Sequence, residues 1–284
     1  MKKLALALVL LASPARAAGA LSALYADGQY DAAMRAGEAA HTAPSLALAA
    51  RAALADAVMR DAPCMACLKR AEADARAAMA ADPKLADGPV WLAVALGYQT
   101  RLTGILAARW RGAPGQAKAA LMQAVRNDPK SPFAVSALGG WNIEVVRAAG
   151  AYLARALYGA TEAKGLALCD RAVKLQPGNV AVRYQIGLSL AGFDVDRYHD
   201  RILGELDAAM AAPAQTAYEK FIQARAAAPP RWPRCSRPET GSASIRGCAN
   251  FKPTLEGRRH ANRPVRRTGA LRGAVRLLDE QQRF

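Results

Sequence analysis

The stretch Ala124-Val-Arg-Asn-Asp-Pro-Lys-Ser-Pro-Phe-Ala-Val-Ser-Ala-Leu-Gly-Gly-Trp-Asn142 contains the pattern that decides the fold. A helix ends before Pro129, because proline lacks an N–H and disfavours the α conformation in the residue before it. A second helix begins near Pro132, since proline is well tolerated in a first helical turn. In that helix a bulky Leu138 precedes a small Gly139, which allows a neighbouring helix to approach closely. The stretch therefore predicts two helices joined by a short turn.

The same pattern occurs three times in the chain with the same offsets. Each copy has an alanine five residues before a proline, a leucine or isoleucine nine residues after it, and a small residue ten after it. The three sets are Ala78, Pro83, Leu92 and Ala93; Ala124, Pro129, Leu138 and Gly139; and Ala172, Pro177, Ile186 and Gly187. Offsets that agree in three places identify an internal repeat of helical hairpins.

This pattern resembles the tetratricopeptide repeat (TPR), in which such an alanine, a closing proline and a leucine–glycine pair hold helical hairpins in a stack. The prolines are 46 and 48 residues apart, whereas the usual period is about 34 residues. The extra length is itself duplicated, since residues 101–113 match residues 147–160 with one gap. The resemblance implies an all-α, right-handed solenoid of antiparallel hairpins over residues 18–227, with elongated repeats.

The alanine-rich composition agrees with a helical fold, because aromatic residues make up 6% of the chain and no segment alternates like a strand. Residues 21–40 are interpreted as a first, irregular repeat. Four further helices are expected at residues 45–58, 67–81, 201–212 and 217–227.

The N-terminus has the pattern of a secretory signal peptide. Lys2 and Lys3 precede a short apolar run, and Ala15-Arg-Ala17 supplies the small residues that a signal peptidase needs. The run is too short to span a bilayer, and no cysteine at the cleavage point suggests a lipid anchor. We therefore expect residues 1–17 to be removed after Ala17, and the mature chain to be a bacterial periplasmic protein without a transmembrane segment.

The chain's net charge of +16 lies mainly in its last part. Residues 226–284 hold 13 Lys and Arg against 4 Asp and Glu, a net charge of +9, and residues 1–17 add +3 through Lys2, Lys3 and Arg16. This leaves a net charge of only +4 for residues 18–225. Residues 228–284 are expected to form a disordered tail, which is interpreted in three ways. It is a basic arm for anionic polymers or membrane surfaces, it carries a loop closed by Cys235 and Cys248, or it is translated out of frame after a frameshift near residues 226–234.

We favour the frameshift. Back-translation with a shift of two bases turns residues 234–256 into an amphipathic helix that would complete the last hairpin. On this interpretation the tail's charge says nothing about partners, and no nucleic-acid partner is predicted.

A Cys64-Met-Ala-Cys67 motif lies between the two helices expected at residues 45–58 and 67–81. In an exported protein it favours a local disulfide that fixes the start of the second helix. Redox activity is the alternative, because a CxxC motif at a helix start can have a depressed thiol pKa. No histidine follows Cys67, which excludes a c-type haem site, and no second pair stands at zinc spacing. We therefore predict no metal and no cofactor.

Catalytic motifs are not found in the sequence. His41, His199 and His260 have no partner at a useful spacing, and GxSxG, phosphate-loop and HExxH patterns are missing. The chain is therefore predicted not to be an enzyme.

The TPR resemblance does imply a binding surface on the inner face of each first helix. Carried over from the family pattern, this face contains Asp87, Val90, Val94, Tyr98, Phe133, Ser136, Gly140, Glu144, Tyr184 and Leu188. Apolar and aromatic residues mixed with a few charges suit an extended peptide or a partner helix. The alternative for Tyr98, Phe133 and Tyr184 is that they pack between hairpins.

These expectations combine into a periplasmic TPR-like scaffold that binds a protein or peptide partner in an envelope complex. One alternative is an accessory protein that binds an apolar small molecule beside a solute transporter. A second alternative is a redox-active exported protein that uses Cys64 and Cys67. Repeat folds host many functions, so the fold alone does not choose between them.

Overall fold

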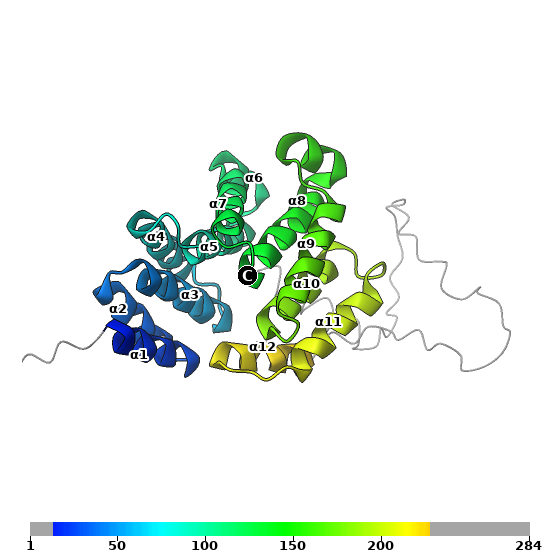
Figure 1. Cartoon of the computed structure of the whole chain (residues 1–284). Helices are drawn as coiled ribbons and strands as arrows, with labels where there is room; N and C mark the ends of the chain where they lie inside the picture. The colour runs from blue at the N-terminus through cyan, green and yellow to red at the C-terminus, as the bar shows by residue number, and fades with distance from the viewer. Residues whose placement is uncertain (1–13, 228–284) are drawn as a thin grey trace, which may run out of the picture.

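A computed structural model describes residues 14–227, and every regular element in that part of the chain is an α-helix (Figure 1). The helices are α1 Pro14–Ala26, α2 Tyr30–Ala40, α3 Ala43–Met59, α4 Met65–Ala81, α5 Asp87–Thr103, α6 Ile105–Trp110, α7 Ala113–Asn127, α8 Pro132–Tyr158, α9 Glu162–Leu175, α10 Val180–Phe193, α11 His199–Ala211 and α12 Ala217–Ala227. Consecutive helices pack as antiparallel hairpins, chiefly α3 with α4, α5 with α7, α8 with α9 and α10 with α11.

Local chemistry sets the helix ends at the repeat prolines. α4 and α7 both stop one residue before an aspartate, and in each case the aspartate side chain accepts a hydrogen bond from the backbone N–H two residues later. These bonds join Asp82 Oδ1 to Lys84 N at 2.8 Å and Asp128 Oδ1 to Lys130 N at 2.9 Å. The following helix α8 is capped by Ser131, whose side chain accepts from Ala134 N. The helix break at Pro129 and the start at Pro132 are thus confirmed.

The repeated small residues lie where neighbouring helices touch. Ala78, Ala124 and Ala172 are fully buried. A Cβ atom placed on Gly139 would lie 2.9 Å from Cys169 Sγ and 3.0 Å from the carbonyl oxygen of Gly165, so α8 and α9 meet almost backbone to backbone. The repeat positions therefore serve close helix packing, as their residue types predict.

Successive hairpins are also joined through the carbonyl groups of the repeat prolines. Asn127 Nδ2 donates to the Pro83 carbonyl oxygen at 2.8 Å, and Arg171 Nη2 donates to the Pro129 carbonyl oxygen at 2.5 Å. Gln123 Nε2 also donates to the Pro83 carbonyl oxygen at 3.0 Å. Gln123 and Arg171 each lie six residues before the proline of their own repeat, so this contact between hairpins recurs at an equivalent position.

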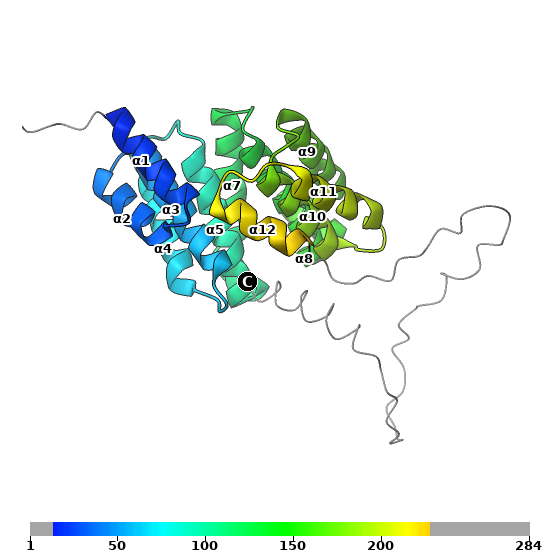
Figure 2. The ribbon, with the colours of Figure 1, turned by 90° about the horizontal axis from the view of Figure 1, so that it is seen from below.

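The stack of hairpins curves into a ring that α12 closes. Figures 1 and 2 show α12 between the last hairpin and the N-terminal helices, and α12 packs against α10 and α11 as well as α1 and α3. Gly28, in the α1–α2 turn at φ +79°, approaches α12 so closely that an added Cβ would lie 2.9 Å from Ala217 Cβ. The inner, concave face is consequently enclosed on all sides within the plane of the ring.

Several predictions fall on residues outside the described range. The basic arm, the Cys235–Cys248 loop and the frameshift all concern residues 228–284 or the junction just before them, and the signal sequence mostly precedes residue 14. Among residues 18–26 of α1, the two buried residues are Leu21 and Tyr25. Both follow the expected cleavage point after Ala17, so cleavage there would retain the part of α1 that packs into the core.

Candidate partner-binding face

An arginine of α3 is surrounded by aromatic rings from three other helices. Arg51 projects from α3, and its Cζ lies 4.6 Å from the ring centroid of Tyr25 on α1. The same atom lies 5.3 Å from the ring of Trp91 on α5 and 5.2 Å from the ring of Phe133 on α8. Cations attract aromatic faces at these distances, so three separate helices hold one positive charge in place.

No carboxylate pairs with Arg51 in the part of the chain that the structure describes. The ion pairs of residues 14–227 involve other basic residues, at positions 35, 60, 70, 76, 101, 147, 183, 197, 199 and 201. A guanidinium has five N–H donors arranged to bind a carboxylate through two parallel hydrogen bonds. The donors of Arg51 are thus not committed to an acidic group of these helices.

Titratable groups around Arg51 respond to its charge and to burial. Burial raises the pKa of Tyr25, and the charge of Arg51 opposes that rise. Asp87 is exposed as a residue, yet partial desolvation of its carboxyl raises its pKa, again against the opposing effect of Arg51. Burial is thus the larger effect on both groups, and Arg51 is the charge that lowers the pKa of each.

A second aromatic group lies beside the first, where α12 crosses the ring. Tyr218 of α12 packs against apolar residues of both the N-terminal and the C-terminal hairpins. Burial raises the pKa of Tyr218 well above 10, and the nearby phenols of Tyr98, Tyr25 and Tyr184 raise it further. Four tyrosines from α1, α5, α10 and α12 thus converge inside the ring.

Two of the residues expected to contact a partner are buried. Val90 is 1% exposed and packs with Ala124 and Ala134, and Tyr184 is 4% exposed within the large C-terminal cluster. A partner cannot reach either side chain in this arrangement of the helices. Val90 is covered by the α7–α8 contact, whereas Tyr184 is covered by the C-terminal hairpins together with α12.

Four more of the residues expected to contact a partner lie in three separate places. Asp87 and Phe133 lie beside Arg51, whereas Tyr98 lies beside Tyr218, with Arg101 Cζ 5.3 Å from its ring centroid. Glu144 lies apart from both groups and pairs with Arg147 at 2.8 Å and with Arg101 at 3.7 Å.

Ser136, Gly140, Val94 and Leu188 are the remaining four, and a Cβ added to Gly140 would lie 3.3 Å from Ser189 Oγ. Ser136 Oγ donates to the Phe133 carbonyl oxygen at 3.2 Å, and Val94 and Leu188 are half-buried against the apolar clusters. The charged residues of the expected face thus lie in two places, with Asp87 beside Arg51 and Glu144 beside Arg101 and Arg147.

The two cysteines of the CxxC motif form a disulfide in the structure, with their Cα atoms 5.3 Å apart. Cys64 Sγ also accepts a hydrogen bond from Cys67 N at 3.1 Å and so caps the first turn of α4. This position fits a role in fixing the start of α4. Redox activity of the pair stays a prediction.

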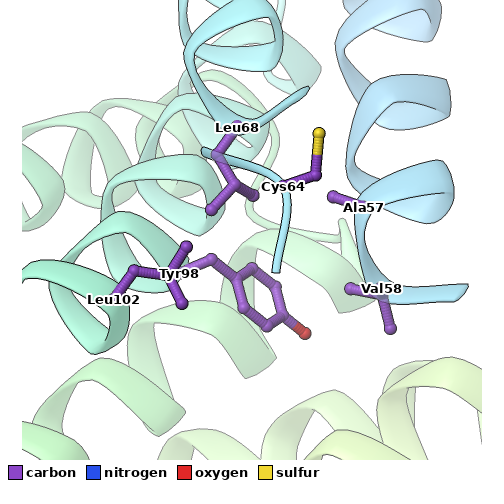
Figure 3. A pocket seen from close by; sticks show the side chains of 6 residues that line it. All are labelled: Ala57, Val58, Cys64, Leu68, Tyr98 and Leu102. Carbon is purple, nitrogen blue, oxygen red and sulfur yellow. The ribbon is translucent and has the colours of Figure 1, made fainter. Parts of the chain in front are cut away.

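Beside the disulfide lies a cavity of about 10 Å³, lined by Ala57, Val58, Cys64, Leu68, Tyr98 and Leu102 (Figure 3). Such a volume holds about one water molecule, so this cavity cannot hold an apolar ligand. Residues 14–227 contain no group of three or more His, Cys, Asp and Glu side chains placed to bind a metal ion. None of the described helices is long and apolar enough to cross a membrane.

Comparison with known proteins relates this fold to one solved structure. The chain matches no protein-family model and no curated protein. It is similar to the crystal structure of a thermophilic TPR protein from Thermus thermophilus, with a TM-score of 0.52 and 20% sequence identity, over 76% of this chain and 98% of that one. The chain therefore has a helical-repeat fold like that of a TPR protein. The predicted all-α, right-handed solenoid of antiparallel hairpins is confirmed.

Sequence reasoning missed Arg51 and Tyr218. Arg51 is the one basic residue of α3, whose other residues are almost all apolar, and this isolated charge was a usable signal. Tyr218 gave no comparable signal, because the repeat pattern weakens after residue 192 and nothing local shows that α12 reaches α1.

Proposed function

We propose that this chain is an exported TPR-type scaffold that binds a protein or peptide partner in a complex of the cell envelope. The observation that carries the proposal is Arg51, held on the concave face by three aromatic rings and not paired with a carboxylate of residues 14–227. Arginine and aromatic residues are enriched among the residues that dominate interface energies. Export is supported by the signal pattern of residues 1–17 and by the core residues of α1 that follow Ala17.

The enclosed shape of the face determines what kind of partner segment fits. Because α12 joins the last hairpin to α1 and α3, the concave face is bounded by helices around the whole ring, which favours a short partner segment over a whole domain. A short extended segment with an acidic side chain or a terminal carboxylate suits the space beside Arg51 and Asp87. In this proposal the chain acts as a scaffold without catalytic residues, and the carboxylate of the partner replaces the ion pair that Arg51 lacks among the described helices.

Site-specific photo-crosslinking in the cells that make the protein tests this proposal. A crosslinking residue at Asp87, exposed and close to Arg51, is expected to trap one protein or peptide partner. The same residue at Lys174, exposed on α9, serves as the comparison. Arg51→Met should abolish the adduct from position 87, while Arg35→Met, which removes an exposed arginine on α2, should leave it unchanged. An adduct that persists in Arg51→Met, or that forms only from position 174, would show that the concave face does not bind the partner.

The aromatic interior favours one second candidate, the accessory protein for an apolar small molecule beside a solute transporter. Tyr25, Tyr98, Tyr184 and Tyr218 offer ring surfaces that would suit such a ligand. Native mass spectrometry of the purified protein distinguishes the candidates. A bound small molecule that is lost on denaturation, together with no crosslinked partner, would replace the scaffold proposal by this one.

A further inference from the structure

The two elongated hairpins end in similar projecting segments, here called the tip segments, at residues 104–112 and 150–159. Each begins with a glycine in nearly the same backbone conformation, Gly104 at φ 85°, ψ 156° and Gly150 at φ 76°, ψ 156°. A short helix follows in each, and four residues after each glycine lies a fully buried alanine, Ala108 or Ala154. One buried alanine thus packs each tip segment against the helices below it.

The bulky apolar side chains of the tip segments are exposed to solvent. Of the nine exposed large hydrophobic residues in the described part of the chain, six belong to these two short segments. They are Trp110 (84% exposed), Tyr152 (83%), Leu106 (70%), Ile105 (54%), Leu157 (52%) and Leu153 (46%). Single exposed apolar residues need no explanation, but a concentration of this kind marks an interaction surface.

Both tips project from the same edge of the ring, at the top of Figure 1. A hydrogen bond connects the two hairpins there, since Lys118 Nζ of α7 donates to the carbonyl oxygen of Tyr158 at 2.7 Å. An ion pair between Arg101 of α5 and Glu144 of α8, at 3.7 Å, joins them again. The two apolar tips consequently belong to one surface.

This surface also carries the positive charge of the described part. Residues 101–118 and 144–160 together contain six Arg and Lys and one acidic residue, Glu144, which pairs with Arg101 and Arg147. Residues 18–227 have a net charge of +4, and these two segments have a net charge of +5, so the rest of that range has a net charge of −1. The edge that exposes tryptophan, tyrosine and leucine is therefore also the basic edge of the ring.

We propose that the tip segments dock this protein on the surface of an anionic lipid bilayer. Trp110 and Tyr152 would enter the boundary between headgroups and acyl chains, where tryptophan and tyrosine are enriched in membrane proteins. Arg109 and Arg155 would reach the lipid phosphates while their aliphatic stems follow the apolar chains. Charge complementarity favours anionic lipid over a second copy of this edge, which would bring two sets of positive charges together.

The shape of the surface favours lipid over a folded protein partner. The tips are two convex projections, and a fluid bilayer deforms around each of them, whereas a protein interface requires a matching concave surface. The tip helices are too short to cross a bilayer, since a spanning helix needs about 20 residues. Docking is therefore peripheral and reversible, and it depends on both apolar contact and charge.

Vesicle sedimentation with the full-length chain tests the proposal. The fraction of protein that pellets is measured against lipid concentration, with vesicles of phosphatidylcholine alone or of equimolar phosphatidylcholine and phosphatidylglycerol. Wild-type protein should pellet with the anionic vesicles. Trp110→Ser combined with Tyr152→Ser should lower the partition coefficient at least about tenfold. The matched control, Met122→Ser with Met210→Ser, removes two exposed apolar side chains elsewhere and should leave it unchanged.

A second pair of variants isolates the charge. Arg109→Gln with Arg155→Gln should weaken binding to the anionic vesicles by about tenfold, while Lys130→Gln with Lys174→Gln should have little effect. All variants retain residues 228–284, so any contribution of that basic segment is common to them.

Two results would overturn the proposal. One is wild-type protein that stays in the supernatant with anionic vesicles, and the other is equal partition of the tip variants and their controls. If the tip variants instead lose a crosslinked protein while vesicle binding is unchanged, the tips form a protein interface.

Discussion

Asp74 on α4 is a carboxylate whose protonation depends on the fold. It is 8% exposed, its Oδ2 has no hydrogen-bond partner among the described residues, and burial raises its pKa to about 6 from 3.8. The neighbouring charge of Glu38 raises the pKa further, and Arg70 opposes the rise. At neutral pH the folded protein must therefore hold an unfavourable buried charge.

The sign of the pH dependence follows from the raised pKa. Below about pH 4 the carboxyl is protonated in both folded and unfolded chains, whereas between about pH 4 and pH 6 only the folded chain keeps its proton. Asp74 should therefore reduce the free energy of unfolding as pH rises through this window. We expect Asp74→Asn to stabilise the protein by on the order of 2 kcal/mol at pH 8 and to have little effect at pH 4.

Urea unfolding of wild type and Asp74→Asn across this pH range measures the difference. Asp61→Asn, at an exposed position, is the control and should show no comparable pH dependence. A stability difference between wild type and Asp74→Asn that stays constant with pH would contradict the expectation.

At the scale of helices, the contact between α8 and α9 depends on Gly139. Its added Cβ would lie 2.9 Å from Cys169 Sγ and 3.0 Å from a backbone oxygen of α9, which cannot move without shifting the helix. Gly97, inside α5, has no atom within 4 Å of an added Cβ among those of the described chain. Both glycines thus lie inside a helix, but a methyl group has free space at Gly97 and clashes with α9 at Gly139.

The same substitution should consequently have opposite effects at the two positions. Gly97→Ala is expected to stabilise the protein by about 0.5–1 kcal/mol, because alanine favours a helix. Gly139→Ala gains the same propensity but forces α8 and α9 apart, for a net loss of about 1–2 kcal/mol. Thermal unfolding of both variants provides the measurement. If both changed the melting temperature in the same direction, helix packing at Gly139 would be looser than the structure implies.

The sequence alone could predict the features of the fold that depend on neighbouring residues. Proline chemistry at Pro129 and Pro132 acts within a few residues, so the end of α7 and the start of α8 were predictable. The small repeat residues likewise predicted close hairpin contacts. For Tyr184 the sequence left two alternatives, partner contact or packing between hairpins, and could not decide between them, because its burial depends on α12 and on several hairpins. The environment of Arg51 depends in the same way on side chains from three other helices.

For the whole molecule, α12 joins the two ends of the solenoid. At its start, Glu219 Oε2 accepts from Thr216 N, and Thr216 Oγ1 accepts from Glu219 N, each at 3.1 Å. This reciprocal pair is a capping box. Gln223 Nε2 donates to the carbonyl oxygens of Ala209 and Ala212 at 2.8 and 2.7 Å, which fixes α12 to α11. On the other side of α12, Tyr218 packs against the cluster that contains α1 and α3.

A pair of substitutions in α12 separates ring closure from packing within the last hairpin. Tyr218 contacts both the C-terminal and the N-terminal cluster, while Phe221 belongs only to the C-terminal one. Each residue changed to alanine should lower the free energy of unfolding by about 2–4 kcal/mol through loss of packing. Only Tyr218→Ala should also speed amide hydrogen exchange in α1 and α3, because local opening follows the loss of local contacts. Equal exchange in α1 and α3 for both variants would mean that Tyr218 does not hold the ring closed, and that the concave face opens independently of α12.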